Sequence, residues 1–221
     1  MTPSVIIGID EAGCGALAGP LIVAAAAFLE TSEPVRCVYR TLRGDRELVA
    51  TDSKAVSRPE HREALANAIR EQALAFSVVE RTAKEIDDAL IHNVLVEAIR
   101  LAASRVIERL APRYSDPSQF LVLVDGRHYP PTDVPCTLRA IPHGDALVWQ
   151  IGAASLLAKT TRDQRMIHYA SKYPNYGFER HKGYPVADHK DRLKLYGPCP
   201  IHRESYRPVR ALRPPAMGFE E

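Results

Sequence analysis

The sequence has 221 residues, a length that predicts one domain with its own hydrophobic core. Hydrophobic residues make up 46% of the chain, which excludes a disordered protein. The net charge is only +2, but residues 158–213 carry 13 Lys and Arg against 5 Asp and Glu. Such a basic segment suits either contact with a polyanion or an ordinary solvated surface.

The cysteine spacing and the N-terminal sequence predict the cellular compartment of the protein. The four cysteines include no C-x-x-C pair, so neither a disulfide framework nor a zinc site is expected, and a reducing cytoplasm is the predicted compartment. No signal peptide precedes the first apolar run, and no apolar run approaches the 18 or so residues of a membrane-spanning helix. We therefore expect a cytoplasmic protein without a membrane partner.

The first element is an apolar, β-branched run over residues 5–9, which predicts a strand buried on both faces. It leads directly into the adjacent carboxylates Asp10 and Glu11. Neighbouring carboxylates raise each other's pKa and resist burial, whereas a divalent cation such as Mg²⁺ favours their oxygens. Glycines that allow close approach of the backbone follow, at Gly13, Gly15 and Gly19. The stretch predicts metal-dependent phosphate chemistry, although an isolated pair of acids is more often a solvated turn.

A dinucleotide site is the alternative interpretation of the same stretch. Gly13-x-Gly15-x-x-Ala18 fits the loose pattern G-x-G-x-x-G/A, with Glu30 downstream as a candidate ribose acceptor. Against it, the two acids would lie beside the pyrophosphate without a counter-charge, and Pro20 interrupts the helix that this motif requires.

The later elements predict a mixed α/β fold rather than an all-parallel one, because strands come first and helices alternate with the later strands. A strand or a helix is expected over 21–29, and an irregular excursion over 30–51. Capping boxes at Ser57 and Thr82 open helices to about residue 74 and, in one or two pieces, to about residue 110. The remaining elements are predicted strands at 76–79, 120–124 and 136–141, and predicted helices at 147–171 and 186–196.

Two of these strands repeat the pattern of the first one. Residues 120–124 stop at Asp125, and residues 136–141 lead into His143, Gly144 and Asp145. Adjacent strands would bring all four carboxyl groups to one edge of the sheet, where two divalent ions roughly 3.5–4 Å apart could bind. Each acid alone is weak support, but together with the glycines they form a specific pattern.

Seven segments resemble the signature blocks of ribonuclease HII, the type 2 ribonucleases H, in family order. They are Asp10–Pro20, Asp52–Lys54, Val124–Gly126, Gly144–Asp145, Ala153–Asp163, Tyr176–Tyr184 and Pro200–Ser205. The resemblance implies a ribonuclease H-like fold, with a central mixed β-sheet flanked by helices and a helical C-terminal part. It implies one catalytic domain over residues 1–210, with 172–210 as its basic helical part. We expect 211–221 to be a disordered tail.

The resemblance also implies the activity. The family cuts the RNA strand of RNA–DNA hybrids and nicks 5′ of single ribonucleotides embedded in duplex DNA, as a monomer in replication and repair. Two ions, Mg²⁺ or Mn²⁺, are implied as cofactors, and the products carry 5′-phosphate and 3′-hydroxyl ends. By motif, the catalytic metal ligands are Asp10, Glu11, Asp125 and Asp145.

Substrate contacts follow from the same motifs. Gly13, Cys14 and Gly15 would approach the ribose 2′-OH at the RNA–DNA junction, Tyr184 would stack on the next sugar, and Lys54 would meet a phosphate. Two positions depart from the family, because Cys14 replaces an arginine and His143 replaces a lysine. Cysteine carries no positive charge that could pair with a phosphate, so the family's affinity for its nucleic-acid substrate does not carry over to this chain by resemblance. The alternative function is that of a binding protein without catalytic activity, which would only bind RNA–DNA hybrids.

Three further side chains near these motifs are given no catalytic role. His128 and His143 are expected to be structural or solvent-exposed. Asp163 lies too far along the predicted helix, at about 1.5 Å per residue, to join Asp145, so we expect it to pair with Lys159 on the helix surface.

Overall fold

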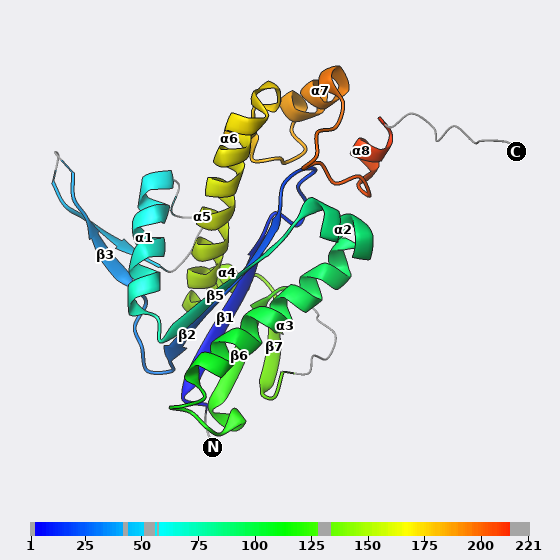
Figure 1. Ribbon diagram of the computed structural model, residues 1–221. Coiled ribbons are helices and arrows are strands. Elements are labelled where there is room, and N and C mark those ends of the chain that lie inside the picture. The colour runs from blue at the N-terminus through cyan, green and yellow to red at the C-terminus, as the bar shows by residue number, and fades with distance from the viewer. Residues whose placement is uncertain (1–2, 42–43, 51–55, 57, 128–133, 213–221) are drawn as a thin grey trace, which may run out of the picture.

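A five-stranded mixed sheet, in the order β5-β2-β1-β6-β7, forms the centre of the molecule (Figure 1). The computed structural model describes residues 3–41, 44–50, 56, 58–127 and 134–212. The sheet strands are β1 (Val5–Ala12), β2 (Leu21–Leu29), β5 (Ala75–Arg81), β6 (Phe120–Asp125) and β7 (Thr137–Ile141). β2 runs antiparallel to β1 and β5, whereas β1, β6 and β7 are parallel, so the predicted mixed fold is confirmed.

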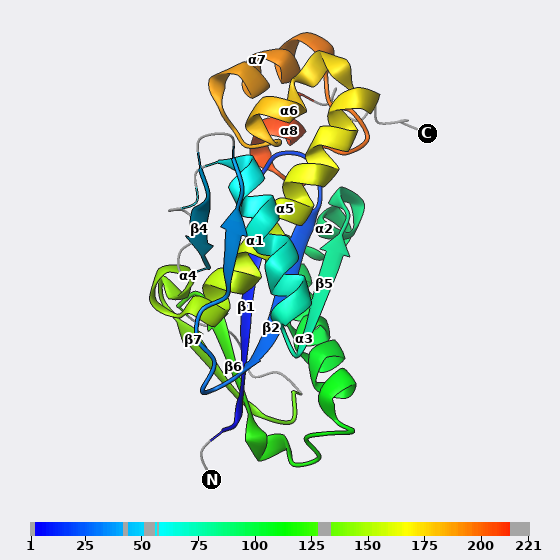
Figure 2. The same ribbon diagram turned by 90° about the vertical axis from the view of Figure 1, so that its left-hand side faces the viewer.

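Helices cover both faces of the sheet (Figures 1 and 2). α2 (Ala83–Ala89) and α3 (Ile91–Leu110) lie on one side, and α1 (Pro59–Gln72) and α5 (Trp149–Lys172) on the other. Successive side chains of a strand point to opposite faces. In β2, Val23 therefore packs into the α3 core and Ala24 into the α1–α5 core. This burial on both faces explains why the run over 21–29 is uninterrupted and why it is a strand.

The predicted irregular excursion over 30–51 is wrong in part, because it contains the two-stranded sheet of β3 (Arg36–Tyr39) and β4 (Arg46–Val49). Cys37 pairs with Leu48 across it. Leu48 is buried in the α1–α5 core, and Cys37 packs against that core. Four-residue strands in a charged segment give too little hydrophobic periodicity to be recognised, although tertiary packing stabilises them.

The two predicted capping boxes have different outcomes. At Thr82 both reciprocal bonds form, and two helices follow, separated at Leu90 by a positive φ of 65°. The box predicted at Ser57 falls on a residue outside the described ones; the N-cap of α1 is Arg58, which forms no side-chain cap. Pro59, which suits the first helical position, sets this start instead.

The C-terminal part packs at one end of the molecule, beyond the end of β1 (Figure 2). It contains η2 (Pro174–Tyr176), α6 (Phe178–His181), α7 (Ala187–Tyr196) and α8 (Arg207–Arg210), and α7 confirms the helix predicted over 186–196. A small core that includes Met166 of α5, Phe178 and Ala18 joins this part to the glycine segment, the glycine-containing loop between β1 and β2. Of the tail predicted over 211–221, residues 213–221 lie outside the described residues.

Two of the exclusions drawn from the sequence can be compared with the structure. All four cysteines are free thiols. Among the described residues, no helix has the length and apolar character needed to cross a bilayer.

Candidate active site

The four predicted acids line one pocket of about 260 Å³ at an edge of the sheet. The pocket is lined by Asp10, Glu11, Ala12, Asp125, Asp145, Ser155, Lys159 and Tyr184. The parallel strands β1, β6 and β7 are neighbours in the sheet, so their C-terminal ends lie along the same edge. The predicted convergence of the carboxyl groups is therefore confirmed.

The strand predicted over 5–9 places Asp10 and Glu11 after its end. In the structure both acids lie inside β1, which extends to Ala12. β2 pairs with β1 as far as Ala12, placing Asp10 opposite Ala24 and Glu11 opposite Val23. Pairing with β2 therefore holds this part of β1 in the sheet, and the amide of Glu11 donates a hydrogen bond of 2.7 Å to Asp10 Oδ1. Asp10 is only 5% exposed, which makes it an unusually buried carboxyl group.

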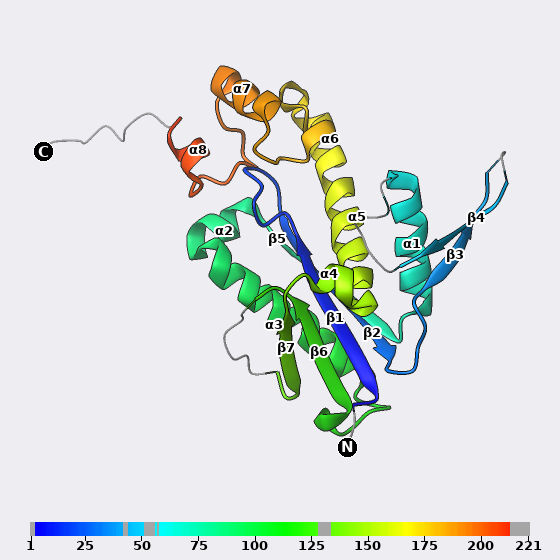
Figure 3. The ribbon, with the colours of Figure 1, turned by 180° about the vertical axis from the view of Figure 1, so that it is seen from behind.

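Asp125 and Asp145 are linked through the backbone of α4 (Gly144–Leu147), which lies against β6 and the start of α5 (Figure 3). Asp125 is the last residue of β6, and its Oδ1 accepts a hydrogen bond of 2.7 Å from the amide of Gly144. Asp145 follows in the first turn of α4, so the prediction of an acid at a strand end is wrong for this residue. The extra turn still buries its carboxyl group at the pocket.

The electrostatics of the acids fit an all-oxygen site for divalent cations. Burial, and then the neighbouring Glu11, raise the pKa of Asp10 well above its usual value. Burial, and then Asp125, raise the pKa of Glu11. Among the described residues, no group of three acids, histidines or cysteines is placed so that it could hold a metal ion without some movement of the side chains. The donors have the chemistry that Mg²⁺ and Mn²⁺ require, and a cation would offset their mutual repulsion.

Two pocket residues of α5 were given no role from the sequence alone. A hydrogen bond from Ser155 lowers the pKa of Asp10, opposing the effect of burial, and Lys159 adds a cation to the acidic pocket. They are four residues apart, so they lie on one face of the helix. That spacing was a usable signal within the segment Ala153–Asp163.

Two buried arginines hold the glycine segment that follows β1. Arg162 of α5 donates to the carbonyl oxygens of Ala18 and Pro20, each at 3.1 Å. Arg203 donates to Gly19 at 3.0 Å and to Cys14 at 2.9 Å. Their side chains are 1% and 0% exposed. The segment is therefore a rigid loop, and sequence reasoning missed both residues that fix it.

The glycines of this loop serve different purposes. Gly13 has a φ of 97°, and a Cβ there would overlap Arg162 Nε, so the packing of the loop itself demands glycine. Gly15 is exposed, and its backbone faces open space, where another molecule can approach. The loop leads into β2 and not into a helix, so the dinucleotide alternative is wrong, because its pyrophosphate site needs a helix N-terminus.

Cys14 is half-buried and is not among the residues that line the pocket. Its side chain packs against the α3 core, and burial raises the pKa of its thiol, which is therefore neutral at pH 7. Lys54, the predicted phosphate ligand, lies outside the described residues, as does His128. His143 is exposed, as predicted.

Tyr184 lies at the pocket although it comes from the C-terminal part of the chain. The guanidinium of Arg162 is 5.0 Å from the centre of its ring. Next to it, the Gly183 carbonyl accepts a hydrogen bond of 2.8 Å from the amide of Leu17. The tyrosine and the glycine loop are thus parts of one assembly beside the acids.

Comparisons with known proteins find a matching family and a matching fold. The family model described as Ribonuclease HII matches residues 7–209. A ribonuclease HII of Marinomonas sp. (strain MWYL1) is 42% identical over 209 residues, covering 94% of this chain and 92% of the relative. The crystal structure of ribonuclease H2 from Pyrococcus horikoshii OT3 has a TM-score of 0.71 at 25% identity, covering 94% and 96% of the two chains. Bst-RNase HIII in complex with Mn²⁺ shares the fold, with a TM-score of 0.63 at 14% identity over 96% of this chain and 65% of that chain.

Proposed function

The chain belongs to the ribonuclease HII family and is a hydrolytic nuclease, and on that premise we propose its specific reaction. It cuts the RNA strand of RNA–DNA hybrids and nicks 5′ of single ribonucleotides embedded in duplex DNA. The products carry 5′-phosphate and 3′-hydroxyl ends. The protein acts as a monomer in the cytoplasm and serves ribonucleotide removal during DNA replication and repair.

The observation that carries this proposal is the composition of one pocket. Four carboxylates, carried by β1, β6 and α4, share it with Lys159 and with a partly exposed aromatic ring, Tyr184. Acids alone would suit many phosphate-processing sites. A ring beside them adds a surface on which a nucleotide can stack, which is how proteins commonly hold single nucleotides.

We assign Asp10, Glu11, Asp125 and Asp145 as ligands of two divalent ions, Mg²⁺ or Mn²⁺. The Mn²⁺ bound by the structurally similar Bst-RNase HIII supports a divalent cation. When bound, the ions supply an activated water and stabilise charge on the leaving 3′ oxygen. Ser155 orients the carboxyl group of Asp10 through its hydrogen bond. Lys159 attracts the phosphate to be cut, since it is the cation among the described residues that line the pocket.

Selection of RNA requires contact with the 2′-OH, which DNA lacks. The backbone at Gly13–Gly15 is suited to this contact, because Gly15 faces open space while the arginines fix the loop behind it. The duplex on either side of the ribonucleotide would lie against the C-terminal part of the protein, whose exposed cations attract phosphates. They are Arg180, Lys190, Lys194, Arg207 and Arg210.

One gel tests the function. An end-labelled duplex with a single ribonucleotide, an all-DNA duplex and a long RNA–DNA hybrid are incubated with Mg²⁺, with Mn²⁺ or with EDTA. We expect a nick 5′ of the ribonucleotide and cutting of the hybrid in either metal, with no cutting in EDTA or of DNA. Equal cutting of the all-DNA duplex would contradict the proposal. Tight binding without cutting would favour the hybrid-binding alternative.

The role of Tyr184 can be measured by substitution. Stacking is worth about 1–3 kcal/mol, so Tyr184→Ala should lose roughly 5- to 150-fold in kcat/KM on the single-ribonucleotide duplex. Tyr184→Phe should keep most of the activity, because the ring remains. If the tyrosine only packs the loop, Tyr184→Ala will lose the same factor in kcat/KM on the single-ribonucleotide duplex and on the long hybrid. Its thermal stability will also fall.

Asp163 provides the contrast to the pocket acids. It pairs with Arg62 at 3.5 Å and, as predicted, with Lys159 at 4.0 Å, and it is not among the residues lining the pocket. We expect Asp163→Ala to reduce kcat/KM by less than about tenfold, because its carboxyl group pairs with Arg62 and Lys159 outside the acids of the pocket and is assigned no metal ion. Asp145→Ala should cost on the order of 10³-fold, because a metal ligand supplies several kcal/mol. Equal losses in two folded variants would give Asp163 a catalytic role.

A further inference from the structure

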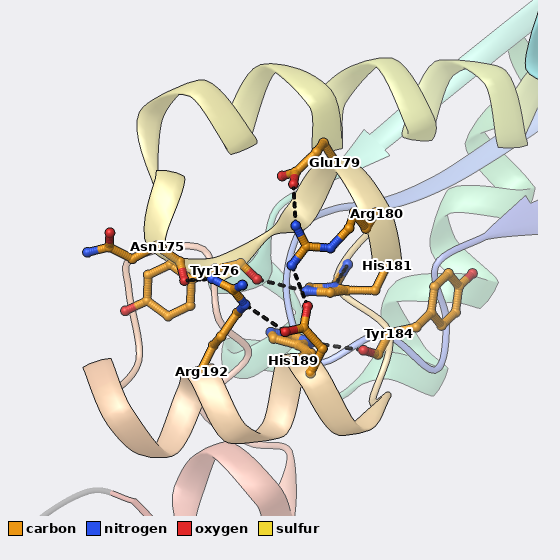
Figure 4. Close-up of polar contacts among 10 residues, drawn as sticks. Asn175, Tyr176, Glu179, Arg180, His181, Tyr184, His189 and Arg192 are labelled. Carbon is orange, nitrogen blue, oxygen red and sulfur yellow. Dashed lines mark hydrogen bonds and ion pairs between the residues drawn. The ribbon is translucent and has the colours of Figure 1, made fainter.

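The segment that carries Tyr184 is surrounded by three histidines of the C-terminal part. They are His181 at the end of α6, His189 in α7 and His202 in the following loop. His189 and His202 are 0% and 2% exposed, so their ring nitrogens must find partners inside the protein. Figure 4 shows His181 and His189 beside Tyr184, between α6 and α7.

The backbone partners of two of these rings assign their protons. His189 Nδ1 lies 2.9 Å from the carbonyl oxygen of Tyr184, which only accepts, so Nδ1 carries the proton and donates. His202 Nδ1 receives the amide of Cys199 at 2.9 Å, which is closer than the Cys199 Sγ and carbonyl oxygen at 3.2 and 3.3 Å. The proton of His202 is therefore on Nε2, which donates to His189 Nε2 at 3.1 Å. The result is a directed relay from Cys199 through both rings to Tyr184.

His181 supports the relay from the side. Its ring stacks on that of His189, with centroids 4.4 Å apart and planes at 14°. Its Nε2 donates to the carbonyl oxygen of Tyr176 at 2.8 Å, and its Nδ1 accepts from the amide of Gly183 at 3.2 Å. Burial lowers the pKa of all three imidazoles, that of His202 to about 4. At neutral pH the rings are uncharged, so each nitrogen has one defined role.

The ring of Tyr184 is held from the other side. Arg162 lies under it, and the same guanidinium donates to the glycine loop. The tyrosine is therefore fixed at its backbone by histidines of the C-terminal part and at its ring by an arginine of α5. Both supports come from residues outside the pocket lining.

We propose that His189 and His202 are positioning residues for Tyr184: their relay fixes the Tyr184 carbonyl and holds its ring where a nucleotide at the RNA–DNA junction can stack. The inference rests on the proposed function of Tyr184. Neither histidine lines the pocket of the acids, so neither touches the reacting atoms. Their contribution appears as selectivity for the junction and not as metal chemistry.

A matched pair of variants separates positioning from mere packing. The amide nitrogen of an asparagine reaches the place of Nδ1, so His189→Asn keeps the donor to Tyr184. A glutamine places its amide near Nε2, so His189→Gln keeps the partner of His202 and loses the bond to Tyr184. We measure junction preference as the ratio of kcat/KM on the single-ribonucleotide duplex to that on the long hybrid. His189→Gln should lose roughly 5- to 50-fold of this ratio, within the range for lost stacking, and His189→Asn less than about threefold.

The Tyr184→Ala background completes the test. If the histidine acts through the tyrosine, adding His189→Gln to Tyr184→Ala should not reduce junction preference further. Equal loss in the Asn and Gln variants, or an additive loss in the double variant, overturns the positioning role. Preference lost in Tyr184→Ala but intact in His189→Gln overturns this inference alone. Preference intact in Tyr184→Ala overturns the proposed role of Tyr184 together with it.

A spectroscopic readout tests the relay in the unaltered protein. Long-range ¹H–¹⁵N correlation spectra of the imidazoles at pH 7 should show His189 protonated at Nδ1 and His202 protonated at Nε2. The opposite assignment for either ring, or a charged ring, would contradict the relay whatever the activity data show. This measurement uses the unaltered protein, so its outcome is independent of whether any variant folds.

Discussion

Asp10→Asn is expected to abolish cleavage of every substrate while leaving the affinity for an RNA–DNA hybrid nearly unchanged. The carboxyl group is 5% exposed and shares its pocket with three other acids, so asparagine removes one charged metal ligand without altering the basic surface. Loss of such a ligand removes several kcal/mol of transition-state stabilisation, or a factor of about 10³ or more in kcat. Single-turnover cleavage and hybrid binding in Ca²⁺ measure the two effects separately.

Asp163→Asn is the matched control for this experiment. It makes the same chemical change in α5 at an acid outside the pocket lining. We expect it to bind and cut like the unaltered chain. Substantial cleavage by Asp10→Asn would contradict the assignment of the acids as one metal site. Loss of hybrid binding in that variant would show that the carboxyl group shapes the substrate surface instead.

Arg203→Met is expected to cause the largest loss of stability. The guanidinium is fully buried and donates to the carbonyl oxygens of Cys14 and Gly19 and to the hydroxyl of Tyr206. Methionine fills much of the space but leaves buried carbonyl oxygens with fewer donors, and each unsatisfied group costs about 1–3 kcal/mol. We expect a loss of roughly 3–5 kcal/mol in the free energy of unfolding, measured by urea denaturation. The melting temperature should fall by roughly 6–20 °C.

Arg207→Met, at an exposed arginine of α8, is the control for Arg203→Met. A surface substitution of this kind changes stability by only about 0.5 kcal/mol. Arg203→Lys should also be unstable, because one ammonium group cannot replace the planar fork that reaches two carbonyl groups. Equal unfolding midpoints for the Met variants at 203 and 207 would refute the importance of this buried cation.

Much of the fold was predictable because the decisive signals are local. The apolar run that leads into Asp10 and Glu11, and its repeat before Asp125, mark buried strands that end at functional groups. Thr82 with Glu85 forms its capping box within one turn. Where local signals are short or ambiguous, prediction failed. The strands β3 and β4 have four residues each, and Asp145 lies in a single helical turn after β7.

The candidate site shows the same division. The acids and glycines could be named because like charges and bare backbone are conspicuous in a sequence. Arg162 and Arg203 could not, because their roles depend on carbonyl groups 142 to 189 positions away along the chain. Nothing adjacent to either arginine indicates burial. Ser155 and Lys159 lie between these cases, since their helical spacing was visible but their direction toward Asp10 was not.

The two arginines also fix the order in which the enzyme can mature during translation. The acids of β1 leave the ribosome early, but the loop beside them is tied by Arg203, which is made 184 residues after Gly19. At about 5–20 residues per second, on the order of 10–40 s separate the two events. A nascent chain that stops before Arg203 holds all four acids and Arg162 but still lacks the donors to Cys14 and Gly19 in the loop. The nuclease therefore completes its site only after Arg203 has been synthesised and has reached the loop.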